Sequence, residues 1–316
     1  MDKGPTNNSN DREMNESRDL ASAGICLALT NRLDEMLKLR SAALNFKDPE
    51  GVHSMRVASR RLRSAATDFM PYLTKQSFNP ILKDIRSIAD ALGEVRDQDV
   101  AILALEKLAS EVPPEITSTV HVLIEARKKD RHTARRELKK TLVKDRLNQL
   151  RDEVESNLEK AIRSTQPSSS GLAYLDVARS VIAERLNELE TVSESLYKPL
   201  DVDALHEMRI AAKRLRYAIE LFDECWNVSL GPYAKHASRL QSALGKVHDC
   251  DVWIKSLGKE AADLKSLKHR KQREGMVWLF SHFMELRNTH FSEAFTQWTE
   301  WETEELGQTL RQALNT

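Results

Sequence analysis

The sequence contains few of the residues that build disulfide scaffolds, turns and sheets. Among 316 residues there are three cysteines, ten glycines and nine prolines, and aromatic residues make up 6%. Three scattered cysteines argue against a disulfide framework and for reduced thiols in a cytosol, and the shortage of aromatics disfavours strand-rich folds. Ala, Leu, Glu, Lys and Arg dominate instead, which is typical of helices. We therefore expect an all-α protein in the cytoplasm.

Long apolar segments and an excess of charge are also missing. No run of 18 apolar residues is present, so we expect no membrane span. Residues 1–19 contain no apolar stretch, so we expect no signal peptide there and a disordered polar tail over 1–17. The 48 Lys and Arg balance 48 Asp and Glu. Zero net charge argues against a uniformly basic surface for polyanions, but it leaves the arrangement of the charges open.

The two halves of the sequence resemble each other. The block HSMRVASRRLRSA at 53–65 matches HEMRIAAKRLRYA at 206–218 with an offset of 153. The block LGEVRDQDV at 92–100 matches LGKVHDCDV at 244–252 with an offset of 152. The pattern predicts an internal duplication, with two pseudo-symmetric helical bundles of about four helices each.

A cluster of Ser, Gly and Pro marks the expected boundary between the bundles. It occupies 164–171 and is the only such cluster in the interior of the chain, so it indicates a flexible linker. We expect the tail at 1–17, the first bundle at 18–163 and the second at 172–316.

The two HxxR blocks are expected on the second helix of each bundle, after first helices over 19–44 and 172–197. Asp48 before Pro49 fits the N-cap and first position of that helix in the first bundle, and Asp203 fits the cap in the second.

The LGxV blocks are expected to end the third helices. Gly93 and Gly245 fit a C-terminal cap or a kink, and Asp97 and Asp249 fit the N-caps of the helices that follow. In the first bundle the apolar spacing predicts one long final helix over 117–162.

Each HxxR helix carries a row of basic residues. At 100° per residue, four basic side chains of each block lie within a sector of about 80° beside the buried face. The first basic stripe is His53, Arg56, Arg60 and Arg63, and the second basic stripe is His206, Arg209, Lys213 and Arg216. Like charges one turn apart destabilise a helix unless acids on a neighbour or an external anion neutralise them. Because arginine fits bidentate phosphate contacts, we predict that the stripes bind an anion.

Further basic residues are candidates for the same site. Lys83 and Lys235 occupy the same place in the two repeats, at an offset of 152. Arg131 and Arg135 share a face within the basic stretch 127–136.

An HD pair at 248–249 resembles the pair of metal-dependent phosphohydrolases. That chemistry needs further His and Asp ligands, and the first repeat has Arg-Asp at 96–97 instead. We therefore interpret these aspartates as structural, with Asp99 and Asp251 available to orient an arginine or histidine of the basic stripes.

Each repeat contains an HxMR block with RLR, followed by LGxVxDxDV. This doubled motif resembles the conserved histidine α-helical domain, or CHAD, family over about 19–316. The resemblance implies two bundles around a basic central cavity and non-enzymatic binding of inorganic polyphosphate, with association with polyphosphate granules. We expect no cofactor and no metal. The ligand-contacting residues that the resemblance implies are the two basic stripes with Lys83 and Lys235.

Two rival interpretations stay open, and a third, chelation of a metal ion by His53 and His206, is disfavoured by the cations around them. A metal-dependent enzyme acting on polyphosphate or nucleotides would need a carboxylate cluster beside the stripes, and the candidates are Asp97, Asp99, Asp249 and Asp251. A nucleic-acid-binding module would need exposed aromatics among the cations, and the blocks that carry the stripes contain only Tyr217. We expect no membrane partner, and homo-oligomerisation stays open.

Overall fold

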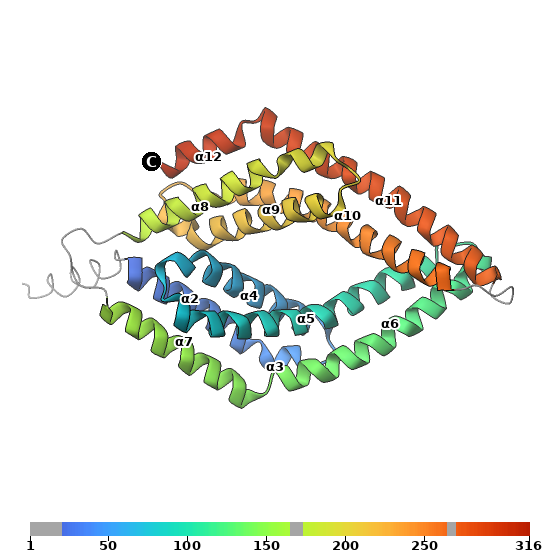
Figure 1. The fold of residues 1–316 in the computed structure, drawn as a ribbon, viewed down its shortest axis with the longest axis horizontal. Coiled ribbons are helices and arrows are strands. Elements are labelled where there is room, and N and C mark those ends of the chain that lie inside the picture. The colour runs from blue at the N-terminus through green and yellow to red at the C-terminus, as the bar shows by residue number, and fades with distance from the viewer. Residues whose placement is uncertain (1–20, 165–172, 264–269) are drawn as a thin grey trace, which may run out of the picture. The chain divides into compact units, whose positions relative to one another are not determined.

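The regular elements of the described residues are all helices. A computed structural model describes residues 21–164, 173–263 and 270–316, and Figure 1 shows the course of its helices. The predicted all-α fold is confirmed. None of the described helices contains an apolar stretch that could cross a lipid bilayer. The expected tail at 1–17 and the linker, apart from its first residue, lie outside the described residues.

The chain divides into two compact units, each built from two separate stretches of sequence. Unit 1 comprises residues 1–93 and 137–182, and unit 2 comprises residues 94–136 and 183–316. The division falls within α5, whose first half belongs to unit 1 and whose second half belongs to unit 2. The predicted duplication, the bundle limits and the central basic cavity stay predictions.

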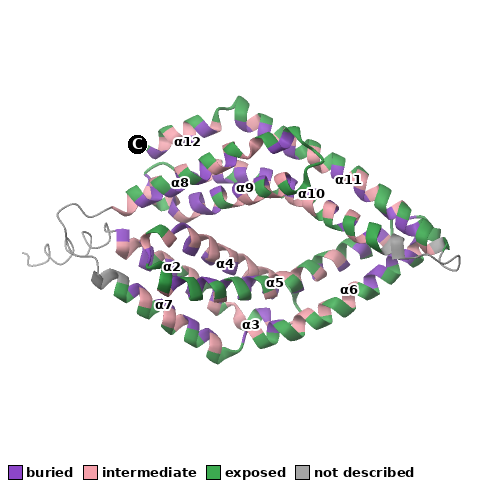
Figure 2. Cartoon of the chain, viewed as in Figure 1, coloured by how far each residue is buried: buried purple, intermediate pink, exposed green. Residues whose placement is uncertain are grey.

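Unit 1 is held together by apolar faces of short and medium helices. Its elements are α2 (Ala21–Lys38), α3 (Arg40–Ala43), α4 (Pro49–Asp68), η1 (Met70–Tyr72), the start of α5 (Lys75–Ala109), the end of α6 (Pro114–Thr141), α7 (Lys144–Ser164) and the start of α8 (Tyr174–Thr191). Helix α2 packs against α4 and α7. Leu33 on α2 and Met55 on α4 are almost fully buried, and Figure 2 shows buried and exposed residues alternating around each helix. This amphipathic pattern is the one that apolar residues at helical spacing predict.

Unit 2 is built around two long helices. Besides the remaining parts of α5, α6 and α8 it contains η2 (Ser193–Tyr197), α9 (Val202–Phe222), η3 (Asp223–Cys225), α10 (Gly231–Asp263), α11 (Arg270–Thr303) and α12 (Leu306–Leu314). Helix α10 packs against both α9 and α11. Helix α12 is tied to α8 because Arg311 on α12 donates hydrogen bonds to Glu190 on α8.

A separate apolar cluster in unit 2 joins the end of α5 and the start of α6 to the end of α10 and the start of α11. Trp253 on α10 and Phe283 on α11 stack with their ring centroids 5.2 Å apart, and the guanidinium of Arg127 on α6 lies 4.8 Å from the centre of the Trp253 ring. Helices α6 and α11 approach closely at Gly275, where an added Cβ would lie 2.2 Å from the hydroxyl oxygen of Thr119.

The single helix predicted over 117–162 is wrong. The chain forms α6 and α7 instead, with a break at 142–143. The break is stabilised by a distant residue, because Arg40 Nε donates a hydrogen bond of 2.7 Å to the carbonyl oxygen of Leu142. A carbonyl at a helix end needs such a partner, and local periodicity does not reveal it.

The helix ends predicted at Gly93 and Gly245 are also wrong. Helices α5 and α10 run straight through the LGxV blocks, and no described glycine has the positive φ that a glycine cap uses. Asp97 and Asp249 therefore lie inside helices and cap nothing. Both glycines leave room for arginine side chains.

Three free cysteines agree with the reduced thiols expected from the sequence: Cys26, Cys225 and Cys250. Burial raises the pKa of each thiol to about 11, so the thiolate form is scarce at neutral pH.

Candidate anion-binding site

The helices that carry the two basic stripes start at capped N-termini. In α4 the backbone N–H of Glu50 donates to Asp48 Oδ1 at 2.9 Å, as the sequence predicts. In α9 the backbone N–H of Ala204 donates to Asp201 Oδ1 at 3.0 Å. The predicted cap Asp203 is wrong, because α9 begins at Val202 and Asp203 lies in its first turn.

The stripe side chains flank the buried faces of their helices, as the helical angles predict. Met55 and Leu62 of α4 are 0% and 2% exposed, and Met208 and Leu215 of α9 are both 0% exposed. Every member of both stripes is half-buried. Each stripe therefore lies at the margin between core and solvent, where a cation is less screened than on an open surface.

The arginine of each HxxR motif lies against the glycine of an LGxV block. A Cβ added at Gly93 would be 3.8 Å from Arg56 Nε in unit 1, and a Cβ added at Gly245 would be 3.7 Å from Arg209 Nε in unit 2. The two arrangements agree within 0.1 Å. In both units the absence of a side chain at the glycine leaves space beside a guanidinium.

The last arginine of each stripe has partners within its own unit. Arg63 lies 3.5 Å from the carboxylate of Asp90. Arg216 donates to Glu220 at 2.6 Å and to Gln241 at 3.3 Å, and its guanidinium lies 5.3 Å from the centre of the Tyr217 ring. These contacts hold the two arginines in place and partly neutralise them.

Two histidines meet at the start of the second basic stripe. The ring of His206 on α9 lies 4.6 Å from the ring of His248 on α10, at an interplanar angle of 38°. Burial first, and then Arg209, lower the pKa of His206 below its ordinary value. Burial, Arg209 and His206 likewise lower the pKa of His248. Both rings are therefore disposed to be neutral near pH 7.

The predicted ligand residues outside the stripes fall into two classes. Lys83 on α5 and Lys235 on α10 are exposed. Arg131 and Arg135 on α6 both donate to Asp99 Oδ1 at 3.2 Å. The Asp99 side chain is only 6% exposed. The two arginines therefore contribute to a buried ion pair within unit 2.

A matching buried pair lies between α10 and α11. Arg287 Nε donates to Asp251 Oδ1 at 2.6 Å, with side chains 5% and 11% exposed. Asp99 and Asp251 are 152 residues apart, and so are Arg135 and Arg287. The second aspartate of each block does pair with arginine, but these arginines lie on α6 and α11 and not in the basic stripes. Arg287 was not singled out from the sequence.

Carboxylates that could hold a metal ion do not gather in the described part of the chain. Among those residues, no group of three or more His, Cys, Asp or Glu side chains is placed to bind one. Asp97 and Asp249 are exposed. Asp99 and Asp251 are already engaged by arginines.

The HxxR and LGxV blocks lie in the part of the chain that a family model matches. A model of the CHAD domain matches residues 27–258, which include both stripes and both glycines. The chain belongs to the CHAD domain family. The matched range ends before α11, so it does not include Arg287.

Two solved structures share the fold of this CHAD protein. The CHAD domain from the plant Ricinus communis has a TM-score of 0.66 and 20% identity, over 88% of this chain and 91% of that one. PptA from Streptomyces chartreusis has a TM-score of 0.67 and 14% identity, over 89% of this chain and 99% of that one.

Two curated relatives come from Mycobacterium tuberculosis. The uncharacterized protein Rv2226 is 25% identical over 185 residues, and the uncharacterized protein MT2285 is 24% identical over the same length. The match covers 58% of this chain but only 36% of each relative. This CHAD chain therefore matches about a third of the length of those proteins.

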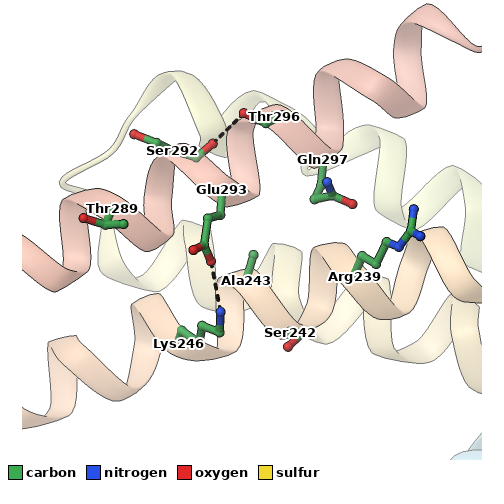
Figure 3. A pocket seen from close by; sticks show the side chains of 9 residues that line it. All are labelled: Arg239, Ser242, Ala243, Lys246, Thr289, Ser292, Glu293, Thr296 and Gln297. Carbon is green, nitrogen blue, oxygen red and sulfur yellow. Dashed lines mark hydrogen bonds and ion pairs between the residues drawn. The ribbon is translucent and has the colours of Figure 1, made fainter.

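A groove between α10 and α11 is lined by none of the residues of the two basic stripes. It has a volume of about 610 Å³ and is lined by Arg239, Ser242, Ala243, Lys246, Thr289, Ser292, Glu293, Thr296 and Gln297. Figure 3 shows Glu293 reaching across the groove to Lys246, 3.1 Å away. The hydrogen bond from Lys246 lowers the pKa of Glu293. The charges in this groove are mixed, unlike those of the stripes.

Proposed function

We propose that this CHAD protein binds inorganic polyphosphate, without catalysis, through its first and second basic stripes. The observation that carries the proposal is the matched placement of Arg56 beside Gly93 and Arg209 beside Gly245, each in a half-buried row of cations. The family is linked to polyphosphate binding and metabolism in general, which supports the same ligand. The basic channel and the polyphosphate granules predicted from the sequence belong to this proposal.

The chemistry of the stripes suits a linear polyanion. Arginine offers planar, bidentate donors to phosphate oxygens and stays charged at every physiological pH. Cations repeat at about one per helical turn, or about 5.4 Å, so successive phosphates can meet successive side chains. A flexible polyanion gives up bound counterions when it is neutralised, so binding is expected to weaken steeply with salt.

Nucleic acid fits the stripes less well than polyphosphate does. Single strands are held by stacking of bases on exposed aromatic rings. The one aromatic residue in the stripe blocks, Tyr217, is only 6% exposed and has Arg216 over its ring. Competition between polyphosphate and single-stranded RNA of equal charge tests this preference, and the proposal expects polyphosphate to win.

A catalytic role would need free carboxylates beside the stripes. Two of the four candidates, Asp99 and Asp251, are engaged in ion pairs with arginines. We therefore include no hydrolysis in the proposal. Incubation with polyphosphate and Mg²⁺ tests this point, because sustained phosphate release above that of a heat-inactivated sample would show an enzyme.

The decisive variant removes the arginines that lie against the glycines. We expect Arg56→Ala with Arg209→Ala to weaken binding of long-chain polyphosphate by roughly 100-fold or more, since each charge-assisted contact contributes about 1.5–3 kcal/mol. The matched control is Arg61→Ala with Arg214→Ala, which removes the same charge from the other side of the same helices. Equal weakening by both variants would show that only net charge matters.

A further inference from the structure

The second basic stripe contains a feature that its sequence motif does not require, a pair of imidazoles. His206 on α9 belongs to the HxxR motif, whereas His248 on α10 does not, since the corresponding residue of the first repeat is Arg96. The two rings lie 4.6 Å apart. One turn along each helix, Arg209 lies against Gly245. Two imidazoles and a guanidinium therefore gather in one place within unit 2.

The charged groups around the pair come from three helices. The cations are Arg209 and Lys213 on α9. The acids are Glu207 and Asp203 on α9, Asp251 on α10 and Asp97 on α5. The cations oppose a positive charge on the rings more strongly than the acids favour one. Asp251 is itself engaged by Arg287 on α11, so its charge is largely compensated.

The hydrogen bonding of the rings also favours their neutral forms. The Nδ1 atoms of His206 and His248 are buried, and neither has a hydrogen-bond partner among the described residues. Within the described residues, no carboxylate therefore accepts a hydrogen bond from these two atoms. A second positive charge 4.6 Å from the first, beside Arg209, would meet repulsion that the nearby acids do not outweigh.

A bound polyanion changes this balance, because it brings negative charge to the same place. We propose that His206 and His248 form a proton-linked contact for the polyanion in unit 2, and that the pair takes up a proton from solvent when the chain binds. This inference rests on the proposed function. It assigns to His248 a contact with the ligand that the repeat pattern does not give it.

The inference predicts a specific pH dependence. Between the low pKa of the free histidines and the higher pKa in the complex, the complex holds more protons than the separate partners. Affinity therefore falls as pH rises through this window, by up to about tenfold per pH unit for one proton. Below the window the rings are charged before binding, and above it they stay neutral in the complex. Arg96, the residue that corresponds to His248 in the first LGxV block, cannot titrate in this range.

The test is calorimetric titration with long-chain polyphosphate at pH 6.5 in buffers of different ionisation enthalpy, which counts the protons taken up. The terminal phosphates of the ligand titrate near pH 6 themselves, so the wild type is compared with His248→Gln at equal ligand. We expect the wild type to take up close to one proton more than the variant. We also expect His248→Arg, which copies Arg96, to bind at pH 8 with an affinity near that of the wild type at pH 5.5.

The possible failures are distinguishable. If the wild type does not bind polyphosphate at any pH from about 5.5 to 8 at low salt, the proposed function is wrong and this inference with it. If it binds but takes up the same number of protons as His248→Gln, this inference alone is wrong. Circular dichroism checks that the variants fold. His206→Gln repeats the same comparison from the other ring, and equal proton uptake by that variant would also overturn the inference.

Discussion

Arg209 lies against Gly245, with its Nε 3.7 Å from the position that a Cβ would take, and Arg56 lies against Gly93 in the same way at 3.8 Å. These distances are those of ordinary van der Waals contact, so a methyl group fits at either glycine. The glycines serve the placement of the arginines and not the ends of the helices.

The first prediction concerns these glycines. We expect Gly93→Ala with Gly245→Ala to raise the free energy of unfolding by about 0.5–1 kcal/mol at each site, because glycine inside a helix costs that much relative to alanine. Polyphosphate affinity should be retained. Gly93→Leu with Gly245→Leu should displace both guanidinium groups and weaken binding by roughly tenfold or more. Unchanged affinity in the leucine variant would show that the placement of the arginines is unimportant.

The second prediction concerns the close approach of α6 and α11. An added Cβ at Gly275 would lie 2.2 Å from the Thr119 hydroxyl oxygen and 2.8 Å from its Cβ, and Thr119 is 2% exposed. We expect Gly275→Ala to lower the free energy of unfolding by about 1–3 kcal/mol, as overpacking does. Adding Thr119→Ala should recover part of the loss. Gly258→Ala, where no atom lies within 4 Å of the added Cβ, is the control and should stabilise the protein in chemical denaturation.

The third prediction concerns the buried ion pair of Asp251 and Arg287. Asp251→Ala leaves a guanidinium that is 95% buried without its partner, so we expect a loss of about 3–5 kcal/mol in the free energy of unfolding. Replacing both residues with leucine and methionine should recover most of it, because an apolar pair of similar volume carries no desolvation cost. Glu111→Ala breaks the exposed pair with Lys107 and should cost less than about 1 kcal/mol.

The fourth prediction concerns the stability of the free protein as a function of pH. The pKa values of His206 and His248 are lowered in the folded chain, whereas the unfolded value is 6.5. The unfolded chain therefore binds more protons between these values, and the stability present above pH 6.5 is lost as pH falls through this window. We expect thermal unfolding to show a smaller decline from pH 7.5 to 5.5 in His206→Gln with His248→Gln than in the wild type. If the stability of the wild type and of the double variant declined equally with falling pH, protonation of these two rings would not destabilise the folded chain.

The placement of the stripes could be predicted from the sequence, because it follows from local geometry. Residues three and four apart share a helix face, so Arg56 and Arg60 had to flank the face that carries Met55. The N-cap at Asp48 was equally local. The repeat of the HxxR and LGxV blocks then sufficed to suggest the family.

Contacts between distant residues could not be predicted in this way. The break between α6 and α7 depends on Arg40, which is 102 residues from Leu142. The apparent helix stop at Gly245 reflected space for Arg209, which only the packing of α9 on α10 reveals. Arg287 could have been identified from the sequence, because its offset of 152 from Arg135 is the offset of the LGxV blocks.

The most direct test of polyphosphate binding is the affinity of the wild type for long-chain polyphosphate over a range of salt concentrations. Six Arg and Lys lie in the two stripes. At roughly −0.7 per contact, as for single-stranded nucleic acids, the slope of log K against log salt should be roughly −4 if all six engage. The variant with Arg56→Ala and Arg209→Ala should reduce the slope by roughly 1.4. Absence of binding at low salt, or binding that does not change with salt, would contradict the account.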